Sequence, residues 1–119
     1  MKAVVFYGKG QVELAERPTP QAGAGQVLIR VRACGLCGTD RHIYHGEFPA
    51  RPPVIIGHEY AGEVVAVGDG VGDLAPGDRV AVDPNIACGR CRPCRQGRVH
   101  LCENLAALGV NYDGGFAEY

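Results

Sequence analysis

The sequence predicts a mainly β domain, a small and irregular barrel or sandwich with short helices. Three observations lead to this fold class. The 18 glycines and 8 prolines separate short apolar runs, a pattern typical of strands joined by tight turns. Several of these runs are rich in valine and isoleucine, and one alternates apolar with polar residues. At 119 residues, 46% of them hydrophobic, the chain has the length of about one domain and can bury a core without disulfides.

The first predicted strands are Ala3–Phe6 and Val12–Ala15, and the short connection GKGQ predicts that they form a hairpin. A loop rich in proline and glycine, RPTPQAGAGQ, follows. The next strand is Val27–Cys34, in which apolar residues alternate with Arg30 and Arg32, so one face is expected to be buried. That buried face is expected to contain Val27, Ile29, Val31 and Ala33.

A short helix is predicted to start at Thr39 or Asp40, since both residue types are good N-caps. The strands Val54–Ile56, Tyr60–Val67 and Arg79–Val82 follow, and the final GGFAEY indicates the start of another strand. Between these elements lie two long loops that contain most of the cysteines and histidines. Loops held by a rigid scaffold are where functional side chains concentrate.

The second of these loops, CGRCRPCRQGRVHLC, contains four of the six cysteines. Thiols three residues apart share a tight turn, so their sulfurs can point to one centre. Four thiolates around one centre form the closed tetrahedral site of structural zinc. Disulfides fit poorly, because a bridge between cysteines three residues apart is strained, and two such bridges, 88–91 and 91–94, cannot share Cys91. His100 could compete as a ligand, but the complete cysteine set makes it unnecessary. The predicted zinc ligands are Cys88, Cys91, Cys94 and Cys102.

The charge of the chain limits its partners. Four thiolates on one zinc ion leave a net charge of −2, and four arginines in the loop are expected to offset that charge and to donate hydrogen bonds to sulfur. A zinc ribbon that binds nucleic acid is disfavoured, because no aromatic residue interleaves the arginines and the net charge of the chain is −1. The arginines are Arg90, Arg92, Arg95 and Arg98.

No apolar run reaches the length of a membrane span, and the N-terminus MKAVVFYGKG lacks the features of a signal peptide. We therefore expect no membrane partner and a cytoplasmic location. In that reducing compartment, clustered cysteines bind metal more often than they form disulfides.

A second group of candidate ligands is Cys37, His58 and Glu59. Together they offer sulfur, nitrogen and oxygen, as open catalytic zinc sites often do. Each also has an ordinary structural interpretation, since a single cysteine is usually a small core residue and a single histidine a satisfied surface or core group. The spacing alone leaves the catalytic and the structural interpretations both open.

Five motifs occur in the order CGLCGTDRH, GHEYAGEVVAVG, GDRVAVDP, the cysteine loop and DGGFAEY. In this order they resemble the zinc-dependent medium-chain alcohol and polyol dehydrogenases, over nearly the whole chain. The resemblance implies that residues 1–119 form a GroES-like catalytic domain with a zinc-binding lobe at 88–102. It also implies an NAD(P)-linked oxidoreductase that converts an alcohol or polyol to a ketone or aldehyde.

The same resemblance assigns roles to individual residues. Cys37 and His58 match catalytic zinc ligands, and Glu59 matches either a ligand or a carboxylate just behind the ligands. Zinc lowers the pKa of a bound alcohol, and hydride then passes to the nicotinamide.

Three further residues match parts of the proton path. Thr39 resembles the hydroxyl that takes the proton of the alcohol, Asp40 would orient a zinc-bound histidine, and His42 would end the proton relay to solvent.

Cys34 matches no metal position and is expected in the core. Tyr44 and His45 fit either the substrate cleft or the surface.

The family binds NAD or NADP on a Rossmann domain with the fingerprint GxGxxG. The nearest segment here is GDGVGD at 68–73, but Asp73 replaces the third glycine and Pro76 follows where a helix is required. GDGVG is therefore predicted to be a turn. We expect the chain to be a fragment that lacks the Rossmann domain, is inactive alone and belongs to a homo-oligomer when full length. The alternative is a GroES-like zinc module that binds protein partners without chemistry, which would need only the four-cysteine lobe.

Overall fold

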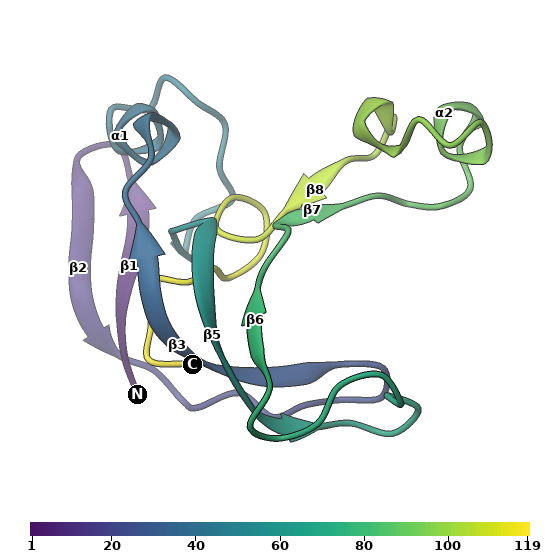
Figure 1. Ribbon diagram of the computed structural model, residues 1–119. Coiled ribbons are helices and arrows are strands. Elements are labelled where there is room, and N and C mark those ends of the chain that lie inside the picture. The colour runs from purple at the N-terminus through teal and green to yellow at the C-terminus, as the bar shows by residue number, and fades with distance from the viewer.

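The computed structural model describes all residues, Met1–Tyr119, and they form a mainly β fold with short helices (Figure 1). The predicted fold class is thus confirmed. The strands are β1 (Lys2–Gly8), β2 (Gln11–Glu16), β3 (Val27–Gly35), β4 (Val54–Ile55), β5 (Glu59–Val67), β6 (Arg79–Ala81), β7 (Asn85–Ile86) and β8 (Ala106–Ala107). The helices are α1 (Gly38–Tyr44), α2 (Arg92–Arg95) and the 3₁₀ helix η1 (Val99–Leu101). No helix has the length and apolar character needed to cross a membrane.

The strands pair in three antiparallel sheets, ordered β2-β1-β4, β3-β5-β6 and β7-β8. The predicted hairpin is present as β1 and β2, with Gly10 at a φ of 72° in the turn. The final segment meets β1 through a single bridge between Ala3 and Ala117, with the Val4 N–H donating to the Phe116 carbonyl at 2.8 Å. The expected last strand is therefore absent as a regular strand, and the segment joins β1 through an isolated bridge.

Strand β3 departs from the predicted alternation. Arg30 and Arg32 are exposed as expected, but Ala33 is exposed too. The reason is a pair of register shifts against β5, one of them between Val31 and Ala33. Such bulges rotate the side chains that follow them to the other face.

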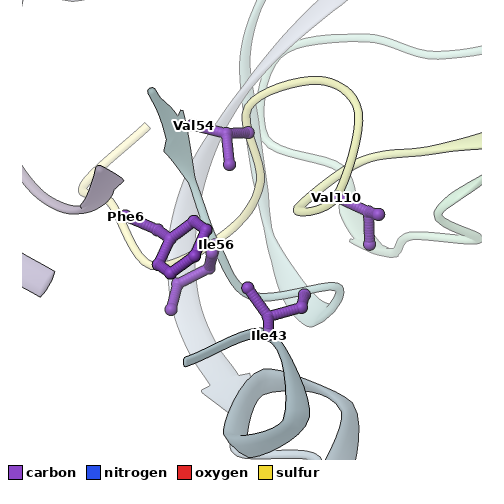
Figure 2. Packing of buried hydrophobic residues seen from close by; sticks show 5 residues of the cluster. All are labelled: Phe6, Ile43, Val54, Ile56 and Val110. Carbon is purple, nitrogen blue, oxygen red and sulfur yellow. The ribbon is translucent and has the colours of Figure 1, made fainter. Parts of the chain in front are cut away.

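The main apolar cluster packs helix α1 against the first sheet (Figure 2). Ile43, on α1, is fully buried against side chains from β1, β4 and the chain beyond β8. The cluster consists of Phe6, Ile43, Val54, Ile56 and Val110. It anchors both α1 and the segment that leads into β5, and these two elements carry the second group of candidate ligands.

Beyond β6 the chain leaves this core. Strands β7 and β8 pair with each other and carry α2 and η1 outward, so residues 88–102 project away from the sheets (Figure 1). The stretch 68–73 forms turns with no helix after it, as the sequence predicts.

Candidate metal centres

The four cysteines of the projecting lobe lie around one point. Their sulfurs are all within 4.8 Å of one another, and the Sγ atom of Cys91 lies 3.3 Å from that of Cys94 and 3.9 Å from that of Cys102. A tetrahedron of sulfurs, each about 2.3 Å from a zinc ion, has edges of about 3.8 Å. No cysteine of the chain is in a disulfide. The geometry therefore fits one tetrahedral zinc ion.

Backbone N–H groups surround these sulfurs. Cys88 and Asn104 each donate an N–H to the Sγ atom of Cys102 at 3.3 Å. The four arginines of the lobe are exposed, and none of their side chains hydrogen-bonds to sulfur. The expectation that guanidinium groups would donate to the thiolates is wrong, because the tight turns already direct peptide N–H groups inward. Arg98 bonds to Gln96 instead.

The thiols of the lobe differ in their pKa values. Hydrogen bonds from the N–H groups of Arg90 and Cys91 lower the pKa of Cys88 to about 6. The neighbouring Cys91 sulfur raises the pKa of Cys94 to about 12. Sulfurs this close cannot all carry a negative charge without a cation among them. A zinc dication at their centre would supply the positive charge and would displace the remaining thiol protons.

The second cluster joins two segments of the chain. Cys37 is the N-cap of α1, whereas His58 precedes β5 and Glu59 begins it. One ligand atom from each lies within 4.8 Å of the other two. Gly57, just before His58, has a φ of 93°, a conformation in the left-handed region that glycine adopts without strain. Glu59 is exposed, so this cluster is open to solvent on one side.

Asp40 lies behind both segments. Its side chain is only 3% exposed. The Oδ2 atom accepts the Cys37 N–H at 2.9 Å, and Oδ1 lies 3.4 Å from Nδ1 of His58. Oδ1 and Nδ1 are both buried, and neither makes a hydrogen bond. An imidazole whose Nδ1 faces a carboxylate keeps Nε2 for a metal, so the residues present fit a zinc ion. Helix α1 starts at Gly38 with Cys37 as its N-cap, so the predicted start at Thr39 or Asp40 is wrong.

The other predicted residues lie around this cluster. Thr39 is adjacent, with Oγ1 3.7 Å from the Cys37 sulfur. His42 is on the surface, where Nδ1 lies 2.7 Å from Glu47 Oε2. Tyr44 and His45 are exposed and form an edge-to-face ring pair 5.3 Å apart. They line neither of the two main cavities.

Cys34 is half-buried rather than in the core, and burial raises the pKa of its thiol.

An open cleft of about 540 Å³ lies beside His58 and Glu59. Its other lining residues are small or apolar: Ala33, Gly35, Tyr60, Ala61, Ala81, Val82 and Pro84. A larger apolar hollow of about 660 Å³ contains none of the predicted site residues.

Sequence reasoning named DGGFAEY as a motif but gave the segment Asp113–Phe116 no role at the site, although it lies against the residues before His58. The doublet Gly114-Gly115 is a signal that could have indicated this contact, because paired glycines often mark a close approach of two backbones.

Comparisons with a family model, with curated proteins and with solved structures all lead to one protein family. The model of the alcohol dehydrogenase GroES-like domain matches residues 23–119. Two curated relatives match the whole chain over 120 residues: the starvation-sensing protein RspB of Escherichia coli K12 at 47% identity, and D-altritol 5-dehydrogenase of Agrobacterium fabrum C58 at 49%. The chain spans 35% and 36% of these relatives, about a third of their length.

A solved structure agrees with these matches. A candidate zinc-binding dehydrogenase of Sinorhizobium meliloti 1021, bound to NADP, superposes with a TM-score of 0.97 at 53% identity. The match covers 99% of this chain and 34% of the other.

Proposed function

This chain belongs to the alcohol dehydrogenase family through its GroES-like domain, and from that premise we propose that it is the zinc-binding part of an NAD(P)-linked dehydrogenase. The reaction would oxidise an alcohol or polyol to a ketone or aldehyde. One observation carries the proposal: Cys37, His58 and Glu59 converge within 4.8 Å, with a buried carboxylate behind them. A module without chemistry has no need of this second cluster.

Cys37 and His58 would hold the catalytic zinc, and Glu59 would be the third ligand or a nearby carboxylate. A bound zinc ion would lower the pKa of the alcohol hydroxyl. Asp40 would hold His58 with Nδ1 protonated, since a carboxylate close to that nitrogen favours the proton there. The same carboxylate fixes the N–H of Cys37, so one buried group would orient two ligands.

The alcohol proton would pass first to the Thr39 hydroxyl, which lies beside the Cys37 sulfur. Thr39 and His42 are three positions apart on α1, so they share one face of the helix. His42 is exposed and contacts the carboxylate of Glu47. It would therefore release the proton to solvent at the helix surface.

The substrate class follows from the cleft and from the relatives. The cleft beside His58 is lined mainly by small and apolar residues, which leave room for a chain of carbon atoms. The A. fabrum relative is named for a dehydrogenation at carbon 5 of a polyol. We therefore favour a secondary alcohol or polyol as substrate.

NAD or NADP would bind to a part of the full-length protein outside residues 1–119. The stretch 68–73 offers only turns, without the helix N-terminus that a pyrophosphate requires. The S. meliloti neighbour binds NADP. Leu36, 83% exposed and adjacent to Cys37, would pack against that cofactor-binding part. Residues 1–119 would then be one catalytic-domain unit carrying the lobe 88–102, and inactive alone.

The proposal includes a cytoplasmic location and a homo-oligomer of the full-length protein. Six unpaired thiols fit a reducing compartment. The oligomer rests on family resemblance alone.

A second candidate is a zinc module that binds partners without chemistry. It would need only the four-cysteine lobe. The two candidates differ in the second cluster, which only the dehydrogenase needs.

The test uses the full-length protein with NAD or NADP and a panel of secondary alcohols and polyols. We expect reduction of the cofactor, followed by its absorbance, and a loss of nearly all rate in Cys37→Ala. Cys34→Ala, which changes a thiol outside both clusters, is the matched control and should keep the rate. Full activity of Cys37→Ala, or none in the wild type with any substrate, would favour the module without chemistry.

A further inference from the structure

The segment 113–116 is hydrogen-bonded along its length to the residues that precede His58. Gly114 donates its N–H to the carbonyl of Ile55 at 2.8 Å, and Phe116 donates to that of Ile56 at 2.9 Å. Gly115 donates to the carbonyl of Gly57 at 2.7 Å. The side chain of Asp113 accepts the Ile55 N–H at 2.8 Å. Every peptide between Ile55 and His58 is therefore tied to this segment.

The contact is too close for a side chain at its centre. A Cβ on Gly114 would collide with the Gly57 carbonyl oxygen, and a Cβ on Gly109 would lie 2.5 Å from the same oxygen. The ring of Phe116 lies 2.8 Å from where a Cβ on Gly57 would be. Real Cβ atoms essentially never approach other atoms this closely. The Gly57 peptide is thus enclosed on more than one side.

We propose that the segment 113–116 is a positioning element that fixes His58 and sets the metal affinity of the second cluster. This inference rests on the proposed function, because it requires that Cys37, His58 and Glu59 bind a metal. The physical reason is entropic. A ligand on a mobile loop loses conformational freedom when it binds metal, whereas a ligand already held loses little.

The two metal ligands would then be fixed by different means. Cys37 is held by the Asp40 carboxylate. The Oδ1 atom of Asp40 lies 3.4 Å from Nδ1 of His58, and the two atoms do not form a hydrogen bond. The backbone contact of the segment 113–116 would therefore supply most of the order at His58.

The test is a cobalt(II) titration of the full-length protein, because cobalt reports its ligands through its visible spectrum. We expect the wild type to bind two ions per chain, one with the spectrum of four thiolates and one with a mixed set. In Gly114→Ala, we expect affinity at the mixed site to fall by about 10- to 100-fold, the range for losing an outer support of a metal ligand. The four-thiolate spectrum should not change.

Gly72→Ala is the matched control, since no atom lies within 4 Å of a Cβ there and the backbone φ is not positive. Hydrogen exchange of β1 and β3 reports whether the variant keeps its fold. If Gly114→Ala does not fold, Asp113→Ala removes one hydrogen bond and creates no clash, and should weaken the mixed site alone.

The outcomes separate the two hypotheses. A wild type that binds a single cobalt ion, with four thiolates, would overturn the proposed function and this inference with it. Two ions in the wild type and an unchanged mixed site in folded Gly114→Ala or Asp113→Ala would overturn the positioning role and leave the proposed function standing.

Discussion

The two clusters of candidate ligands are built in opposite ways. The four cysteines of the lobe come from one continuous loop, 88–102, and peptide N–H groups of the lobe and its edge surround their sulfurs. Cys37 and His58 come from two separate segments, which meet through a buried carboxylate and a packed core. The lobe projects from the sheets (Figure 1), whereas the second cluster lies at the start of helix α1 and the start of strand β5.

This difference predicts where stability comes from. The lobe has no core of its own, since Cys102 is its only buried residue. Metal binding must then provide much of its folding free energy. The second cluster is held by strands and helix whether or not a metal is present. Losing metal should therefore disorder the lobe and leave the second cluster in place.

The largest effect is expected from Cys91→Ser. Structural zinc sites of this type bind with a free energy on the order of 10 kcal/mol, and three thiolates should retain only a small part of it. We expect the lobe zinc to be lost on dialysis against a chelator, with fast hydrogen exchange over 88–102 and unchanged exchange in β1, β3 and β5. Metal analysis and hydrogen exchange measure this.

Cys34→Ser is the matched control, because Cys34 belongs to neither cluster. It should keep the lobe zinc. Fast exchange throughout the chain of Cys91→Ser would contradict the independence of the lobe from the sheets.

The next effect is expected from His58→Ala in the full-length protein. The metal content should fall from two ions to one per chain, and the rate with an alcohol should fall by more than about 100-fold, the upper range for removing an outer support of a ligand. Hydrogen exchange in the lobe should not change. His100→Ala, an exposed histidine inside the lobe, should keep both ions. A loss of lobe zinc in that control would instead make His100 a ligand.

Sequence reasoning found most of this architecture where the signal is local. The hairpin, the strands at 54, 60 and 79, and the residues of both clusters were predicted, because apolar runs, glycine turns and cysteine spacing are each visible within a few residues. The strands β7 and β8 were missed. Each has two residues, too few to show a period.

The features that require distant contacts were predicted wrongly or not at all. One of the two register shifts of β3, between Val31 and Ala33, lies beside Gly62, where a Cβ would collide with the Arg30 carbonyl. The hydrogen bond between Ile55 and Asp113 joins positions 58 residues apart. The helix start was misplaced because the cap is Cys37, a residue type with little capping preference, while Asp40 accepts its N–H from within the first turn.

A smaller effect sharpens the comparison at Asp40. Asp40→Asn keeps an oxygen for the Cys37 N–H but removes the charge that faces Nδ1 of His58. We expect cobalt to bind about 10- to 100-fold more weakly at the second cluster, and the four-thiolate spectrum to stay the same. Asp73→Asn, an exposed acid in a turn, is the control. Equal cobalt affinities in the two variants would show that the charge of Asp40 does not support the metal ligand.

The smallest effect concerns the surface pair at the end of α1. The hydrogen bond from His42 lowers the pKa of Glu47 below its ordinary value of 4.5, and the charges of His42, His45 and Arg41 act in the same direction. A carboxylate whose pKa is lower in the folded state stabilises the fold above its unfolded pKa, and this contribution is lost as the pH falls through the folded value. Because both side chains are more than half exposed, solvent screens the pair and the change in stability should be slight.

His42→Ala should therefore raise the titration midpoint of Glu47, as followed by NMR of its side-chain carboxyl, without changing the metal content of either cluster. The same variant tests the proton path. If the relay ends at His42, then His42→Ala should slow the alcohol reaction at low pH while cobalt binding stays normal. Glu47→Gln separates the two effects, since it removes the carboxylate and leaves the imidazole. If His42→Ala and Glu47→Gln slow the reaction equally, the ion pair itself is what matters. If neither variant changes the rate at any pH, the proton leaves the second cluster by another route, and α1 serves that cluster only through Asp40 and the capping residue Cys37.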